Sequence, residues 1–265
     1  MSLNVSRAVR EAAGRTVSRN GVVFIVVFAV LGALSAVVTD SAFLLLDSLA
    51  TEVEGTEPVD VPTPLGVALP GSVLLLLGLV WLLANAAASV VAMRVLVGEH
   101  TDTIPDDLFS RRLTRATMSD IAAEIVAAVL IGIGLLLLVV PGIFLAICFY
   151  FSRPLIAVED RGFVDALAES WRLSRGNRLR VFALLVIVVL VGLAVSVPTT
   201  LVSALFGGAP AVGSVLGIVL GAVTTVFGLA VVARAFAQLR GDEPETEHAD
   251  EDEHDEWDDP AGVEW

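Results

Sequence analysis

The amino-acid sequence predicts an all-α, polytopic integral membrane protein with six transmembrane helices and cytoplasmic amphipathic helices at the membrane interface. Two observations carry this prediction. First, 56% of the 265 residues are hydrophobic and they form long runs, whereas soluble chains spread charge along their length. Second, the sixteen basic residues are all arginines, and they cluster at the ends of the apolar runs. A helix of about 20 apolar residues crosses the hydrocarbon core.

The chain is predicted to begin with a short helix, 3–19, that lies among the lipid headgroups. Val5, Val9 and Ala12 recur at helical spacing, and arginines occupy the other faces. The apolar run that follows is too long for the core of a signal peptide, so a retained first span is favoured. The chain is divided into an interfacial helix at 1–20, a six-helix transmembrane domain at 21–240 and an acidic tail at 241–265.

Six apolar runs are predicted to span the membrane. They cover residues 22–46, 69–97, 121–140, 143–158, 181–206 and 212–236. The connection 47–64 is acidic, rich in proline and free of arginine, which favours the external side. Pro141-Gly142 and the segment 207–210 are expected to form external turns. Ser152-Arg153-Pro154 is expected to interrupt the short fourth span, because proline kinks a helix.

The arginines predict the orientation of the chain. Arginine near the end of a span stays on the cytoplasmic side. Six spans with both termini inside place every arginine on that side, including those of the connections 99–120 and 159–180. We therefore expect a multi-pass protein of the cell membrane with cytoplasmic N- and C-termini.

The tail is strongly acidic. Residues 242–264 hold thirteen acidic residues and no arginine, and the whole chain has a net charge of −14. Such a segment buries too little apolar surface to fold, so disorder is expected. An acidic chain without lysine is typical of an organism with a salt-rich cytoplasm, which indicates a haloarchaeal source.

The basic segments resemble one another, which predicts three copies of one unit: a basic interfacial helix, a span out, a turn and a span back. Arg94, Arg153 and Arg234 lie near the cytoplasmic ends of the three returning spans. Transporters often contain repeats, with a site where the copies meet. These copies are parallel rather than inverted, and short matches of this kind also arise by chance, so both interpretations stay open.

Few ionisable or strongly polar side chains are singled out within the spans, and each has two interpretations. Glu124 and Arg153 are expected at similar depth and form a predicted pair, either as part of a headgroup or substrate site or as a structural pair. Asn85 lies near the middle of the second span, where its amide either joins two helices or contacts a ligand.

Glycines recur every four residues along the sixth span, at Gly213, Gly217 and Gly221. Small residues at this spacing let a neighbouring helix approach closely. The stripe predicts close packing within the chain, with an oligomer interface as the alternative.

No enzyme motif is found. The sequence lacks a glycine-rich phosphate loop with lysine and a serine in a nucleophile elbow. We predict that the protein is not an enzyme and needs no cofactor or metal. Membrane lipids and a membrane or cytoplasmic protein are the expected partners, and nucleic acid is not.

The segment 141–180 is the most distinctive. It contains the Pro-Gly turn, the arginine-bearing short span, Glu159, and a helix that ends in Gly176-Asn177 before the next span. These features, and Arg19-Asn20 before the first span, resemble the integral membrane domain of glycerophosphoryl diester phosphodiesterases, including stand-alone haloarchaeal relatives. The phosphodiesterase barrel of those fusions is missing, so the resemblance implies a membrane module without catalysis.

Four arginines of this segment are placed to meet anionic lipid phosphates. They are Arg172, Arg175, Arg178 and Arg180. The favoured function is a non-catalytic membrane module that organises lipids or a partner protein. The alternative is a small transporter or lipid-handling permease, which a water-filled cavity reaching Asn85 would favour. An enzyme acting on lipid headgroups is the third hypothesis, and it lacks the clustered carboxylates or histidines it would need.

Overall fold

The computed structural model describes residues 3–54, 63–98, 112–205 and 210–241, and no strand occurs among them. The helices are α1 (Val5–Thr16), α2 (Arg19–Glu54), α3 (Gly71–Val97), α5 (Leu113–Leu137), α6 (Val139–Cys148), α7 (Ser152–Glu159), α8 (Phe163–Ser174), α9 (Arg178–Leu205) and α10 (Pro210–Arg240). Six helical segments are long and apolar enough to cross a membrane, with α6 and α7 counted together as one. The predicted all-α fold with six spans is confirmed.

Several predictions fall on other parts of the chain. The acidic tail, which was predicted to be disordered, lies outside the described residues from 242 onward. So do residues 55–62 of the first connection, residues 99–111 before α5 and residues 206–209 before α10.

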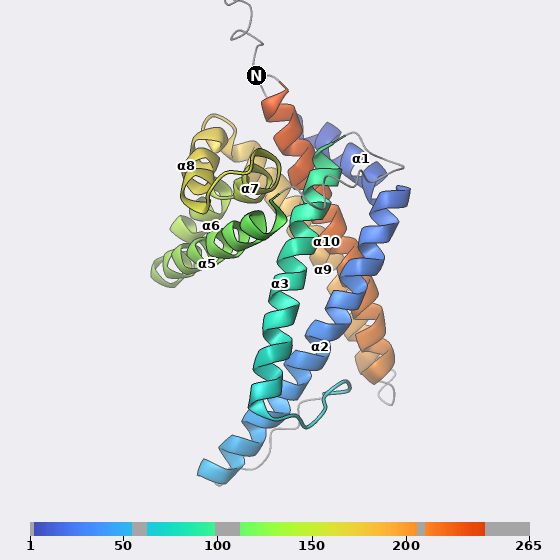
Figure 1. Ribbon diagram of the computed structural model, residues 1–265. Coiled ribbons are helices and arrows are strands. Elements are labelled where there is room, and N and C mark those ends of the chain that lie inside the picture. Colours follow the sequence, from blue (N-terminus) through green and yellow to red (C-terminus); the bar gives the residue numbers. More distant parts are fainter. Residues whose placement is uncertain (1–2, 55–62, 99–111, 206–209, 242–265) are drawn as a thin grey trace, which may run out of the picture.

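The long helices α2, α3, α9 and α10 form the body of the molecule (Figure 1). We call the end that carries α1, α7 and α8 the arginine end, because Arg94, Arg153 and Arg234 lie there. The opposite end carries the described part of the α2–α3 connection, residues 63–70, and is called the loop end. Toward the loop end, α2 and α3 diverge from α9 and α10, while α5 and α6 form a hairpin beside the bundle (Figure 1).

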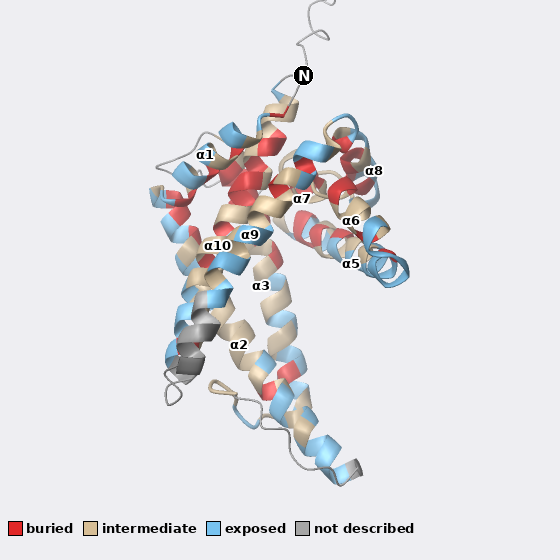
Figure 2. Cartoon of the chain, turned by 180° about the vertical axis from the view of Figure 1, so that it is seen from behind, coloured by how far each residue is buried: buried red, intermediate tan, exposed pale blue. Residues whose placement is uncertain are grey.

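Buried side chains concentrate at the arginine end (Figure 2). Every residue of α3 from Ser89 to Leu96 is buried, whereas Leu74 is the one buried residue of α3 between Gly71 and Asn85. Large apolar side chains elsewhere on the long helices are exposed, among them Leu75 and Leu190. The chain therefore packs its helices tightly at one end and offers apolar faces to lipid along the rest of their length.

The turn between α5 and α6 differs from the prediction. Helix α5 ends at Leu137, and the single extended residue Leu138 leads directly into α6, so Pro141 and Gly142 lie inside the first turn of α6. Proline is tolerated there because the first turn of a helix uses no N–H donor from it. A Cβ atom on Gly142 would lie 2.4 Å from Cγ of Leu135. Glycine is therefore needed where the two helices cross, and not for a turn.

The interruption of the fourth span also differs in position. Helix α6 ends at Cys148 and α7 begins at Ser152, so the break precedes Pro154, which lies in the first turn of α7. Ser170 of α8 satisfies the backbone at the break. Its hydroxyl donates to the Cys148 carbonyl at 2.8 Å and accepts from the Phe151 N–H at 3.0 Å. A broken helix at membrane depth needs such a partner, since unpaired backbone groups are costly there.

The two described interfacial helices, α1 and α8, correspond to each other. Each has 12 residues and is followed by a short turn and a long span. Counted from the first helical residue, both bury the fourth, eighth and twelfth positions and place a glutamate at the seventh. These residues are Ala8, Ala12, Thr16 and Glu11 in α1, and Ala166, Ser170, Ser174 and Glu169 in α8.

The residues of α8 that recur at helical spacing from Phe163, namely Leu167, Trp171 and Ser174, do not all lie on its buried face. Leu167 and Ser174 are buried, but Phe163 is exposed and Trp171 is half-buried. Ala166 and Ser170 take their place because small side chains let α8 lie against the break between α6 and α7.

Candidate functional site

A pocket of about 570 Å³ lies where α2, α3 and α10 diverge. Residues from one face of α2 and one face of α10 line it at helical spacing. They are Phe28, Gly32, Ser35, Ala36, Thr39 and Asp40 of α2, and Ser214, Gly217, Ile218, Gly221, Ala222 and Thr225 of α10, with Pro64, Trp81 and Asn85 completing the lining. Small side chains on both helices leave this space open.

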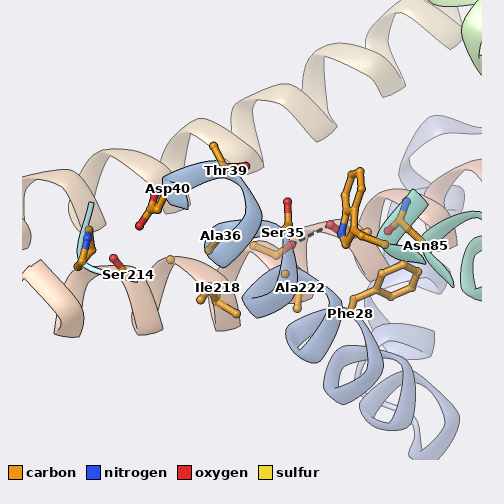
Figure 3. Close-up of a pocket in the computed structure, with 15 residues that line it drawn as sticks. Phe28, Ser35, Ala36, Thr39, Asp40, Asn85, Ser214, Ile218 and Ala222 are labelled. Atoms are coloured by element: carbon orange, nitrogen blue, oxygen red, sulfur yellow. Dashed lines mark hydrogen bonds between the residues drawn. The ribbon is translucent and has the colours of Figure 1, made fainter. Parts of the chain in front are cut away.

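The pocket is elongated and its lining is partly polar. Phe28 and Asp40 are twelve residues apart on α2, which corresponds to about 18 Å at 1.5 Å per residue. Ser35, Thr39 and Asp40 line it from α2, Ser214 from α10, and Asn85 from α3 near Phe28 (Figure 3). No arginine, lysine or histidine is among the described residues of the lining. The polar groups can therefore donate and accept hydrogen bonds, but the lining has no positive charge for an anion.

Asp40 lies at the loop end of the pocket. Its Oδ2 atom accepts a hydrogen bond from the Leu65 N–H at 3.1 Å, and the hydroxyl of the next residue, Ser41, accepts from the Val67 N–H at 3.0 Å. These two bonds fasten the α2–α3 connection to α2. Within the described residues, no arginine contacts Asp40.

Asn85 lies at the other end of the pocket. Its neighbour Trp81, one turn earlier on α3, donates from Nε1 to the Leu31 carbonyl of α2 at 3.1 Å. The half-buried Asn85 side chain makes no hydrogen bond to another described residue. Trp81, rather than Asn85, therefore joins the two helices, and the amide of Asn85 remains open to the pocket.

The glycines of α10 lie in two different environments, one against helix α9 and the other beside the pocket. A Cβ atom placed on Gly217 or Gly221 would meet nothing within 4 Å, while one on Gly228 would lie 3.5 Å from Val188 of α9. Gly213 is buried. Close packing within the chain thus occurs at Gly228, whereas Gly217 and Gly221 line the pocket. The oligomer interface predicted for this stripe stays a prediction.

At the arginine end, arginines bind carboxylates and the carbonyl ends of helices. The buried Arg94 donates from Nε to the Ala157 carbonyl at 2.6 Å, and its Nη2 lies 3.2 Å from Oδ1 of Asp160. Arg15 donates to the carbonyls of Leu96 and Gly98 at the end of α3. Both arginines satisfy carbonyls at a helix C-terminus, where a cation is also favoured by the helix dipole.

The predicted contact between Glu124 and Arg153 is present. Arg153 also bonds a second carboxylate, with Nε at 3.2 Å from Oδ1 of Asp120. Asp120 is 1% exposed. Asn85 lies in the pocket and takes no part in this cluster. The structure therefore brings together two of the three polar residues singled out in the sequence, and adds Asp120 to them.

Glu11 joins α1 to α10. Its carboxylate lies 2.6 Å from Nε of Arg234 and 2.7 Å from Nε of Arg7. Burial acts to raise the pKa of Glu11, but the hydrogen bonds and charges of Arg7 and Arg234 outweigh it, so the pKa lies below the ordinary value of 4.5. Glu11 therefore remains ionised in the folded protein.

A second network joins α7, α8 and α10. Arg240 lies 2.7 Å from Oε1 of Glu159, and Arg161 lies 2.6 Å from Oε2 of the same residue. Arg172 lies 2.6 Å from Oε2 of Glu169 in α8. Much of the basic charge of the arginine end is thus used inside the protein.

The four arginines predicted to contact lipid phosphates have different surroundings. Arg175 and Arg180 are exposed. Arg172 is exposed but paired with Glu169. The guanidinium carbon of Arg178 lies over the rings of Phe144 and Trp171, at 4.7 and 5.6 Å from their centroids. Arg175 and Arg180 are the members of the set best placed to meet a headgroup.

Sequence reasoning missed Asp40 and Asp120. Asp40 lies inside the first predicted span and, like Glu124, is an ionisable side chain whose cost within a membrane marks it as a candidate functional residue. Asp120 was assigned to a connection because the third span was predicted to begin at Ile121, whereas α5 begins at Leu113. The polar lining of α2 could have been found from the spacing of Ser35, Thr39 and Asp40 on one face.

The chain matches the family described as a domain of unknown function (DUF7847) over residues 3–239, and it belongs to that family. The matched range runs from before α1 almost to the end of α10. Comparisons with curated proteins and with solved structures find no match.

Proposed function

We propose that this member of the family is a non-enzymatic membrane protein that binds a ligand between α2, α3 and α10 and moves it as a small transporter or lipid-handling permease. The observation that carries the proposal is the pocket of about 570 Å³ that reaches Asn85. Ligand sites have volumes of about 300–1,000 Å³ and a few polar groups in an apolar lining.

The surroundings of the pocket support the same proposal. The helices that form it pack tightly at the arginine end and diverge at the loop end, so ligand can enter without disrupting the buried core. Gly217 and Gly221 are open on the pocket side. A bundle whose function was only structural gains stability by filling such a space with larger side chains.

Lipid movement in proteoliposomes tests the proposal. The protein is reconstituted into vesicles that contain a trace of fluorescent phosphatidylglycerol or phosphatidylethanolamine, and an impermeant quencher reports how fast inner-leaflet probe reaches the outside. We expect the protein to accelerate loss of fluorescence, and Gly217→Leu to slow it by filling the pocket.

Gly132→Leu is the matched control, because Gly132 lies on α5 and also has nothing within 4 Å of an added Cβ atom. The proposal fails if neither lipid moves faster than in empty vesicles. It also fails if the two variants have the same effect.

A non-transporting module that organises anionic lipids is the second candidate. It is supported by the exposed side chains of Arg175 and Arg180 near the start of α9. The resemblance to the membrane domain of glycerophosphoryl diester phosphodiesterases, which stays a proposal, implies a module of this kind. Loss of co-purified phosphatidylglycerol in Arg175→Gln/Arg180→Gln, with lipid movement unchanged, would favour it.

We further propose that the protein lies in the cell membrane with the arginine end facing the cytoplasm of a haloarchaeal cell. The asymmetry of arginine supports this orientation. A cysteine introduced at Thr56 tests it, in a chain whose Cys148 has been replaced by alanine. An impermeant thiol reagent should label this cysteine in intact cells, and protection of the site until the cells are lysed would reverse the orientation.

A further inference from the structure

We infer that the pocket between α2, α3 and α10 selects an organic cation of the ammonium type and that Asp40 is its counter-ion. The inference rests on the proposed function, since it names the chemical class of ligand for the same pocket.

Among the described residues that line the pocket, Asp40 is the one acidic residue and none is basic. The described acidic residues of the arginine end that are at least half-buried contact arginines, as Glu11, Asp120 and Glu169 do. Asp40 accepts one backbone hydrogen bond, from Leu65, and no arginine contacts it within the described part of the chain. A carboxylate beside apolar helices is costly unless a cation or several donors accompany it.

The chain itself has no cation to offer at this depth. Between Arg19 and Arg94, and again between Arg180 and Arg234, the sequence contains no arginine, lysine or histidine. The two stretches include all the helical residues that line the pocket. The described part of the protein therefore supplies no positive charge beside Asp40, and a cationic ligand in the pocket would supply one.

The other residues that line the pocket indicate which class of cation would bind. Hydroxyl and amide groups from Ser35, Thr39 and Asn85 accept hydrogen bonds, as an ammonium or hydroxyl-bearing ligand requires. Ca²⁺ takes six or more oxygen ligands, often from several carboxylates, and Asp40 is the single carboxylate among the described lining residues. Phosphate and carboxylate ligands lack a basic partner here and would meet the negative charge of Asp40. An organic cation fits the volume and the charge together.

Trp81 provides the readout, because it lines the pocket. The other tryptophans, Trp171, Trp257 and Trp265, are replaced by phenylalanine, which leaves Trp81 as the single tryptophan. The full-length protein is placed in nanodiscs of phosphatidylglycerol, whose headgroup has no ammonium. The probes are choline, dodecyltrimethylammonium, the neutral dodecyl maltoside and the anionic dodecyl phosphate.

We expect a saturable change of Trp81 fluorescence with dodecyltrimethylammonium. Asp40→Asn should raise its Kd about tenfold or more, because the ionic contact between the quaternary ammonium, which has no N–H donor, and the carboxylate is lost. Asp47→Asn is the matched control, since Asp47 lies two turns further along α2 and does not line the pocket. Its Kd should equal that of the parent. Saturation by choline as well identifies a free ammonium compound, whereas saturation by the amphiphile alone identifies a lipid-borne one.

Two results would overturn the inference, and they differ in what they leave standing. If the maltoside or the phosphate saturates Trp81 while the ammonium probes do not, or if Asp40→Asn binds dodecyltrimethylammonium like the parent, the charge assignment is wrong and the pocket remains a ligand site. If no probe gives a saturable change that Gly217→Leu abolishes, both the inference and the proposed function fail.

Discussion

The two ends of the bundle place carboxylates in different surroundings. At the arginine end, the half-buried Glu11 and the buried Asp120 contact arginines on neighbouring helices at 2.6 and 3.2 Å. At the loop end, Asp40 contacts the backbone of a connection and borders an open pocket. The ion pairs of Glu11 and Asp120 hold neighbouring helices together, whereas the Asp40 carboxylate can still accept contacts from a ligand in the pocket.

The difference follows from where the sequence places its arginines. They end at Arg19 and resume at Arg94, so the loop end has no cation with which to close an ion pair. Tight helix packing and the pairing of carboxylates with arginines therefore both occur at the arginine end. A substitution at the arginine end should lower stability, whereas one in the pocket should change ligand binding and leave stability nearly unchanged.

The largest effect is expected for Arg94→Met. Arg94 is 6% exposed and holds both the Ala157 carbonyl and Asp160. Removing one partner of a buried pair costs about 3–5 kcal/mol. Unfolding by SDS, followed by circular dichroism, should show this loss. Arg10→Met, on the exposed face of α1, should change stability by no more than about 0.5 kcal/mol. Equal losses of stability in the two variants would show that the buried contacts of Arg94 contribute no more than an exposed arginine of the same end.

A smaller loss is expected for Ser170→Ala. The substitution leaves the Phe151 N–H and the Cys148 carbonyl without their partner at the break between α6 and α7. Leaving buried backbone groups unpaired costs about 1–3 kcal/mol, which the same SDS titration would detect. Ser48→Ala, which removes an exposed bond to the Leu45 carbonyl within α2, should have almost no effect. Wild-type stability of Ser170→Ala would mean that the break does not depend on α8.

Acid should weaken the contact between α1 and α10. The pKa of Glu11 in the folded protein lies below its ordinary value of 4.5, so the folded state binds this proton less tightly than the unfolded state does. Its contribution to stability is complete above pH 4.5 and is lost as the pH falls through the folded pKa. Unfolding midpoints measured across this range should fall less in Glu11→Gln than in the parent. Identical pH profiles would show that Glu11 carries no such contribution.

The smallest effect on stability is expected for Gly217→Leu. An added side chain meets nothing within 4 Å, so the free energy of unfolding should change by no more than about 0.5 kcal/mol, as at open positions generally. The same variant should nevertheless abolish binding to the pocket. A large loss of stability would place Gly217 in a packed interface instead, as the oligomer prediction requires.

The spans could be predicted from the sequence because hydropathy and the distribution of arginine act over whole segments. The helices α2, α3 and α10 lie within a few residues of the predicted spans, apart from the extension of α2 to Glu54. This extension was missed because acidic residues were interpreted as a loop, although glutamate is a good helix former.

The internal contacts could be predicted less well, because they depend on how helices are placed in space. The contact of Glu124 with Arg153 followed from their similar depth. The partners of Arg94 and Arg234 did not, because Asp160 and Glu11 are distant in sequence and reach them through α7 and α1. The spacing of Gly217 and Gly221 indicates a surface free of side chains, but it does not reveal whether a helix or a ligand occupies the space.

The accessibility of Asn85 tests the central claim most directly. Asn85→Cys and Ala86→Cys are made in a chain whose Cys148 has been replaced by alanine, and Ala86 is 1% exposed. A water-soluble cationic thiol reagent should label Asn85→Cys, leave Ala86→Cys unmodified and react more slowly when Gly217→Leu is added. Failure to label Asn85→Cys, under conditions that label Ser48→Cys, would contradict the existence of an open pocket that reaches Asn85.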